Sequence, residues 1–210
     1  MTGTAAGRNP VDGNRRMAAR GRPIVHNLRG RQRLTMSADE PLQPSFPQAI
    51  EISGQWLTLW EAGELSDEVL ADRVAELVAS RDGARGFFVV ALAGDSPLMD
   101  RLPEPVALQL RLAGAPVVDL MVRNLAMSTA MVQHHQRSGD AEQQAGSERV
   151  QHRSTELLRL LEPVAVKGRL ETLLAAAREG AGDDVAFLER WGYDAQQKLA
   201  ICDAIDSVAE

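Results

Sequence analysis

The pair Arg123-Asn124 interrupts the most apolar stretch of the sequence, which covers residues 117–136. Burying an arginine without a partner costs several kcal/mol, so its guanidinium needs either an acid or a polar cavity. One interpretation is an ion pair with an acid of a packed helix. The other is a helical cavity around Arg123 that binds an anion or another small ligand, with Arg123 and Asn124 as the ligand-binding residues.

A serine nucleophile is the second chemistry to consider, because Gly94-Asp95-Ser96 directly follows an apolar run. These residues are similar to the nucleophile motif of the Gly-Asp-Ser family of esterases and lipases, in which a histidine activates the serine. Those enzymes also need an Asp-x-x-His element, but here no histidine follows His152 and none has an aspartate three residues before it. Without a general base a serine is a weak nucleophile. We therefore assign no catalytic residue and interpret the motif as a turn.

Histidines and acids could also bind a metal ion. Glu148 and His152 share a helix face, but His134 and His152 would lie on the order of 12 Å apart along an antiparallel hairpin. We therefore expect no metal and no cofactor. The polar side chains around residues 133–153, together with aromatic residues that can anchor an interface, form instead a candidate interaction surface. Its members are His134, His135, Glu148, His152, Trp191 and Tyr193.

Helical patterns position most of these residues. Ser66 is a good N-cap, followed by an apolar stripe that we expect to end at Gly83. Residues 117–136 and about 141–161 predict two long antiparallel helices joined by a turn at Ser138-Gly139-Asp140. Asp194 and Gln197 form a capping box for a last helix. The fold class expected is mainly α, a helical bundle around a long antiparallel hairpin.

One segment leaves the choice between helix and strand open. Residues 87–93 form an apolar run with aromatic and β-branched side chains between Gly86 and Gly94, which favours one short buried strand. A buried helix is the alternative. A strand needs a partner, and residues 50–52 are the only candidate.

The charge of the chain changes sharply at Met36. Residues 1–35 have a net charge of +7, and residues 36–210 have a net charge of −13. The basic leader lacks hydrophobic periodicity, so we expect it to be disordered. It is interpreted as an untranslated leader with Met36 as initiator, as an arm that binds nucleic acid or a membrane surface, or as a targeting segment. Residues 36–49, with three prolines, predict an extended lead-in, and residues 50–210 a single helical domain.

Composition limits the location of the protein. The single cysteine, Cys202, excludes an intrachain disulfide and is compatible with a reducing compartment. No apolar run approaches the roughly 20 residues that span a bilayer. The expectation is a soluble cytoplasmic protein without a membrane span.

Three segments, residues 85–89, 123–131 and 189–194, carry a resemblance to a family. They read Arg-Gly-Phe-Phe-Val, Arg-Asn-Leu-Ala-Met-Ser-Thr-Ala-Met and Glu-Arg-Trp-Gly-Tyr-Asp. The chain from about residue 50 onward resembles an uncharacterised family of cyanobacterial conserved proteins. The resemblance implies a cyanobacterial host, a soluble single domain and a start near Met36, but no activity.

Three functions follow as hypotheses. The first is a non-enzymatic interaction or scaffold protein that binds a protein partner, still unidentified, through residues 133–153. The second is a nucleic-acid-associated protein that uses the leader, since the acidic net charge of the remaining chain argues against direct binding. The third is a small-ligand or anion binder, or an enzyme, with a cavity around Arg123. Assembly into a homo-oligomer is compatible with all three.

Overall fold

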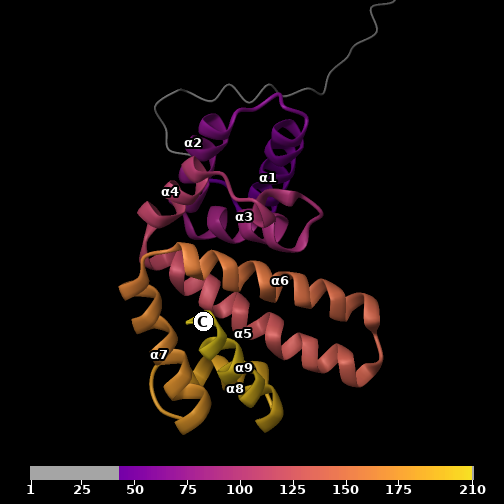
Figure 1. Cartoon of the computed structure of the whole chain (residues 1–210), viewed down its shortest axis with the longest axis vertical. Coiled ribbons are helices and arrows are strands. Elements are labelled where there is room, and N and C mark those ends of the chain that lie inside the picture. Colours follow the sequence, from indigo (N-terminus) through magenta and orange to yellow (C-terminus); the bar gives the residue numbers. More distant parts are fainter. Residues whose placement is uncertain (1–42, 210) are drawn as a thin grey trace, which may run out of the picture. The chain divides into compact units, whose positions relative to one another are not determined.

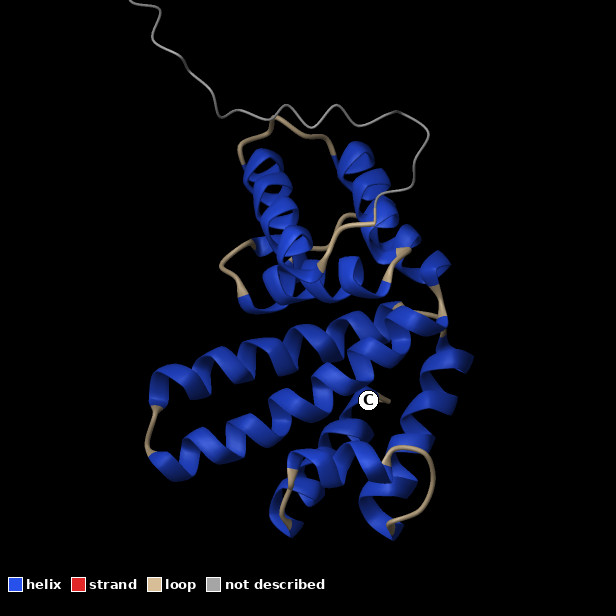
Figure 2. Ribbon diagram, turned by 180° about the vertical axis from the view of Figure 1, so that it is seen from behind, coloured by secondary structure: helices blue, strands red, loops and turns tan. Residues whose placement is uncertain are grey.

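The computed structural model describes residues 43–209, and every regular element in this range is helical (Figure 2). The leader 1–35 and residues 36–42 of the proposed lead-in lie outside the described residues. The elements are α1 (Phe46–Glu61), α2 (Asp67–Val78), α3 (Arg81–Ala93), the short 3-10 helix η1 (Pro97–Asp100), α4 (Glu104–Ala113), α5 (Ala115–Ser138), α6 (Ala141–Leu160), α7 (Pro163–Glu179), α8 (Val185–Trp191) and α9 (Ala195–Val208).

The helical hairpin of α5 and α6 lies in the middle of this unit (Figure 1). Gly139 joins the two helices with a left-handed backbone conformation, φ +73°, which glycine adopts without strain. On one side of the hairpin, α3 packs against α6, and α1, α2 and α4 lie beyond it. On the other side α7 and α9 pack against α5. The predicted helical bundle around an antiparallel hairpin is confirmed.

Many of the fully buried apolar residues lie on the hairpin and on the helices that pack against it. Met121, Val122 and Leu125 of α5 are completely buried, as its apolar pattern predicts for a central helix. Leu173 of α7 and Ile201 of α9 are also completely buried. Because α5 contacts helices on both sides, residues along it can reach either layer of the fold.

Of the two structures left open for residues 87–93, the favoured strand is wrong and the alternative, a buried helix, is correct, because these residues form the second half of α3. The Ser80 hydroxyl accepts a hydrogen bond from the Gly83 backbone, which starts the helix well before the apolar run. Gly83 therefore lies in the first turn of α3 rather than at the end of α2. The run looked like a strand because α3 is buried on most sides. Apart from Asp82, its exposed positions are Arg81, Arg85, Val89 and Ala93, which follow one another at intervals of four residues, as on one face of a helix.

The boundary between lead-in and domain also differs from expectation. The extended lead-in was predicted to reach residue 49, but α1 begins at Phe46. Ser45 and Gln48 form a capping box, and Pro47 lies in the first turn, where the missing proline N–H costs nothing. Prolines therefore start this helix instead of preventing it. The same holds for Pro163 at the start of α7, which also continues through Gly168.

Gly114 separates α4 from α5 with φ +67°. Among the described residues, no single helix has the length and apolar character needed to cross a membrane. The pair α4 and α5 meets that criterion only when both are counted together, across a bend of 101°.

Candidate anion-binding pocket

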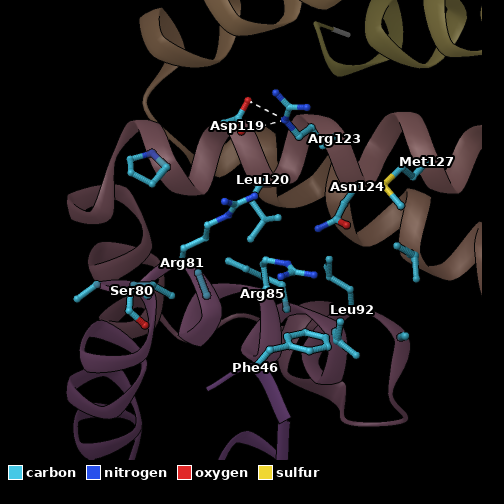
Figure 3. A pocket seen from close by; sticks show the side chains of 18 of the residues that line it. Phe46, Ser80, Arg81, Arg85, Leu92, Asp119, Leu120, Arg123, Asn124 and Met127 are labelled. Atoms are coloured by element: carbon cyan, nitrogen blue, oxygen red, sulfur yellow. Dashed lines mark hydrogen bonds and ion pairs between the residues drawn. The ribbon is translucent and has the colours of Figure 1, made fainter. Parts of the chain in front are cut away.

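A pocket of about 800 Å³ lies between α3 and α5, with contributions from α6 and α8 (Figure 3). Its wall is mostly apolar. Phe88 and Leu92 of α3 face Leu120 and Met127 of α5 across it. Volumes of about 300–1,000 Å³ are typical of sites that hold a small molecule.

The pocket wall on α3 carries two arginines, Arg81 and Arg85, at positions i and i+4 of one helix face. Both side chains rise from α3 toward Leu120 and Asn124 of α5 (Figure 3). Within residues 43–209, Arg81 forms no ion pair. Arg85 lies 3.4 Å from Asp82, and both of these side chains are about half exposed, so the pair is weak. The Arg85 guanidinium carbon also lies 4.6 Å from the centre of the Phe46 ring.

The pocket wall on α5 includes both predicted ligand-binding residues, Arg123 and Asn124. Asn124 points toward α3, whereas Arg123 points toward Asp119 along the edge of the pocket (Figure 3). The Arg123 Nε lies 3.0 Å from a carboxylate oxygen of Asp119, and its Nη2 lies 3.5 Å from Asp184. Arg123 is therefore ion-paired in the structure, as the first interpretation expected. It also borders the pocket.

Arg169 of α7 completes a four-residue ion network behind this wall. It donates to Asp119 at 2.7 Å and forms two hydrogen bonds with Asp184, whose side chain is only 2% exposed. Burial alone would raise the pKa of Asp119, but hydrogen bonds from Arg169 and Arg123 hold it below its ordinary value. Two acids therefore balance two arginines. Outside this network, Arg81 forms no ion pair in the described structure, and Arg85 has only its weak, half-exposed contact with Asp82.

Asp184 directly precedes Val185, the first residue of α8. It stands at the N-cap position, but its side chain makes no capping hydrogen bond, since its oxygens are bonded to Arg169. Arg123 also lies over Phe187 of α8, at 4.9 Å from the ring centre. The ion network thus fixes α8, and Trp191 at the end of α8 borders the pocket.

The candidate interaction residues fall into two groups. His134, Glu148 and His152 are exposed on the hairpin, with His135 half-buried. The rings of His134 and His135 pack edge to face with their centres 5.3 Å apart. In the part of the chain that is described, no group of three or more metal-ligating residues could hold an ion.

The aromatic candidates lie elsewhere. Trp191 is 53% exposed at the pocket. Tyr193 packs against Phe187, with ring centres 6.4 Å apart, and burial raises its pKa to about 12. Arg137 bonds Asp194 and Gln196, so the residues that follow Tyr193 contact the α5 end of the hairpin.

The turn at Ser96 is held by arginines. Arg153 of α6 donates to the Ser96 carbonyl, and Arg149 lies 2.8 Å from Asp95. The Ser96 hydroxyl is buried without a hydrogen-bond partner in the described structure. The sequence interpretation missed these arginines, and it also missed Arg81 and Arg85. The available signal was a spacing of four residues within each pair, which places both on one helix face.

The described fold and site define an all-helical protein with a partly cationic, mostly apolar pocket. The chain belongs to the family described as "Uncharacterised conserved protein UCP020893", whose model matches residues 45–208. This range begins at Ser45, the N-cap of α1. No curated protein and no solved structure matches the chain. The family description names no activity and no organism, so the cyanobacterial origin stays a prediction.

Proposed function

We propose that this chain is a non-enzymatic binding protein whose pocket between α3 and α5 takes a small organic anion with an apolar body. The observation that carries the proposal is an apolar pocket wall combined with two arginines that are free to bind an anion. In the described structure Arg81 forms no ion pair, and Arg85 has only a weak, half-exposed contact with Asp82. The proposal keeps the anion-binding hypothesis but moves its cationic residues from Arg123 to α3.

The charges of the residues around the pocket favour an anionic ligand. Asp119 is the one acid among the described residues that line the pocket, and it already accepts hydrogen bonds from Arg123 and Arg169. Guanidinium groups in a partly apolar site attract anions more strongly than they would in open water, since the effective dielectric constant is lower. Arg85 is also partly ordered by its contact with Phe46, so less side-chain entropy is lost when it binds.

Exposed apolar surface at the pocket favours a ligand with an apolar body. Val89 and Trp191 both border the pocket and are 47% and 53% exposed. Covering such surface is favourable by about 25 cal/mol per Å². A ligand with both an anionic head and an apolar body would satisfy both kinds of wall at once.

Titration calorimetry with octanoate, a medium-chain carboxylate, tests the proposal. We expect saturable binding that Val89→Asp reduces at least about tenfold, because a carboxylate would then face both the apolar body and the anionic head. Val69→Asp is the matched control, since Val69 is a similarly exposed valine outside the pocket. Absence of binding, or equal loss in both variants, would contradict the proposal.

A second candidate is the predicted protein–protein interaction through the hairpin around residues 133–153. The observation in its favour is that Gln133–Glu148 side chains are mostly exposed although α5 and α6 are regular helices there. A purified partner whose affinity falls on joint substitution of His134, His135 and Glu148 by alanine, but not on Val89→Asp, would favour this function over the first.

The remaining hypotheses rest on features outside the described structure. Nucleic-acid binding depends on residues 1–35, and it predicts salt-dependent binding that disappears when these residues are deleted. A cytoplasmic location is part of the proposal and is supported by the single cysteine, which is buried in α9.

A further inference from the structure

We propose that the anionic head of the ligand is a phosphate monoester, so that the pocket distinguishes a dianion from a monoanion of the same size. This inference rests on the proposed function, and it adds the chemical class of the head group. The ligand would be an alkyl or aryl phosphate whose body lies against the apolar wall.

The first argument is charge balance. The ionisable residues that line the pocket are Arg81, Arg85, Arg123 and Asp119. Arg123 and Asp119 belong to the neutral network with Arg169 and Asp184, so they do not need a ligand for charge balance. Of the two other arginines, Arg81 has no acidic partner in the described structure, and Arg85 has only Asp82, in a half-exposed pair that contributes little. Both guanidinium groups are therefore free to bind an anion. A ligand with two negative charges neutralises both, whereas a carboxylate or sulfate leaves one uncompensated.

The second argument is hydrogen-bond geometry. Residues at i and i+4 of a helix have Cβ atoms about 6 Å apart, so the two guanidinium groups can approach one tetrahedral group from different directions. A phosphate monoester offers three acceptor oxygens, and it can accept from two arginines together. A single arginine already satisfies both oxygens of a carboxylate. Asn124, which points toward Arg85 from the opposite wall, adds an amide donor (Figure 3).

The third argument concerns the rest of the ligand. Beyond the arginines the wall consists largely of apolar side chains such as Phe88, Leu92, Leu120 and Met127. Such a wall has few groups to read the hydrogen-bonding edge of a nucleotide base or the hydroxyls of a sugar. The apolar wall therefore favours a hydrocarbon or aromatic body over a sugar or a nucleotide.

Titration calorimetry with octyl phosphate, octyl sulfate and inorganic phosphate tests the inference at about pH 8. The two octyl compounds share one body and differ in head-group charge. We expect octyl phosphate to bind about tenfold more tightly than octyl sulfate. We expect inorganic phosphate, which lacks the apolar body, to bind more weakly than octyl phosphate.

A pH series adds a second readout. The second proton of a phosphate monoester leaves near pH 6. No histidine lines the pocket within the described residues, and the nearby groups are the four lining residues with Asp82, Asp184 and Arg169. Arginine and aspartate side chains do not ordinarily change charge between about pH 5.5 and 8. The affinity for octyl phosphate should therefore fall on acidification, while that for octyl sulfate stays constant.

Variants assign the effect to the two arginines. Arg81→Gln and Arg85→Gln should each reduce the preference for phosphate over sulfate, and the double variant should abolish it. Arg101→Gln is the control, because Arg101 is exposed and lies outside the pocket. Equal affinity of the wild type for octyl phosphate and octyl sulfate would overturn this inference and leave the proposed function standing. No binding of either octyl compound or of octanoate would overturn both.

Discussion

Arg153 of α6 and Asp100 of η1 are joined by two parallel hydrogen bonds, with Nε to Oδ1 at 2.8 Å and Nη2 to Oδ2 at 2.7 Å. Arg153 is only 4% exposed, and its remaining N–H groups donate to backbone carbonyls at the end of α3 and in the following turn. The carbonyls of Ala91 and Leu92 belong to the last turn of α3, where carbonyls have no partner within the helix. One side chain therefore connects the hairpin to the helix that carries the pocket.

Replacing Arg153 with methionine should destabilise the protein by about 3 kcal/mol, because it leaves several buried carbonyls without donors. Urea denaturation monitored by circular dichroism measures the change. Arg149→Met is the control, since Arg149 is 40% exposed and its partner Asp95 is fully exposed, so the loss should stay below about 1 kcal/mol. Equal losses in the two variants would contradict the role given to Arg153.

The same pair predicts a pH dependence. Hydrogen bonds from Arg153, acting against a smaller effect of burial, hold the pKa of Asp100 below the ordinary value of 3.8. The stabilisation is therefore complete above that value and is lost as the pH falls through the lowered pKa. The difference in unfolding free energy between wild type and Asp100→Asn should be present near neutral pH and vanish in acid. A difference that grows on acidification would contradict the sign.

Asp184 should be far more important for stability than its neighbour Asp183. Asp184→Ala leaves Arg169 without its buried partner and should cost about 3–5 kcal/mol. Asp183→Ala changes an exposed side chain and should cost less than about 0.5 kcal/mol. Thermal and urea unfolding of the two variants provide the comparison. Similar stabilities would mean that the ion network does not hold α8.

Gly86 allows α1 and α3 to approach closely. A Cβ added at Gly86 would lie 2.4 Å from the Ala49 Cβ and 2.9 Å from backbone atoms of α1. Gly86→Ala should therefore destabilise the protein by about 1–3 kcal/mol. Gly146→Ala in α6 should have the opposite sign and stabilise by about 0.5–1 kcal/mol, because its Cβ meets no atom within 4 Å. If both variants were stabilised, the close packing of α1 on α3 would be refuted.

Local signals in the sequence predicted much of the fold. Ser66 caps α2, and the Asp194–Gln197 capping box starts α9, as expected. These features depend on residues within one turn, so one sequence is enough to find them. The preference for a strand at residues 87–93 was wrong, because this part of α3 is buried on most sides. Such burial removes the contrast between polar and apolar faces, which is the main sequence evidence for a helix.

The candidate site could be predicted only in part. The unusual position of Arg123 in an apolar stretch was visible in the sequence, but its partner Asp184 lies far along the chain, and only the fold brings the two together. The role of Arg81 and Arg85 could not be predicted from the sequence, because their face of α3 becomes a pocket wall only when α5 packs opposite it. Such pairings depend on tertiary packing, which periodicity does not specify.

Quenching of Trp191 fluorescence by bromo-octanoate tests the central claim most directly. A bromine atom quenches an indole only at close range, and Trp191 borders the pocket whereas the other two tryptophans, Trp56 and Trp60, do not. We predict saturable quenching of the wild type that is strongly reduced in Trp191→Phe, with no quenching by unbrominated octanoate. Saturable quenching that is equal in the wild type and Trp191→Phe, or no quenching of either, would contradict a ligand site between α3 and α5.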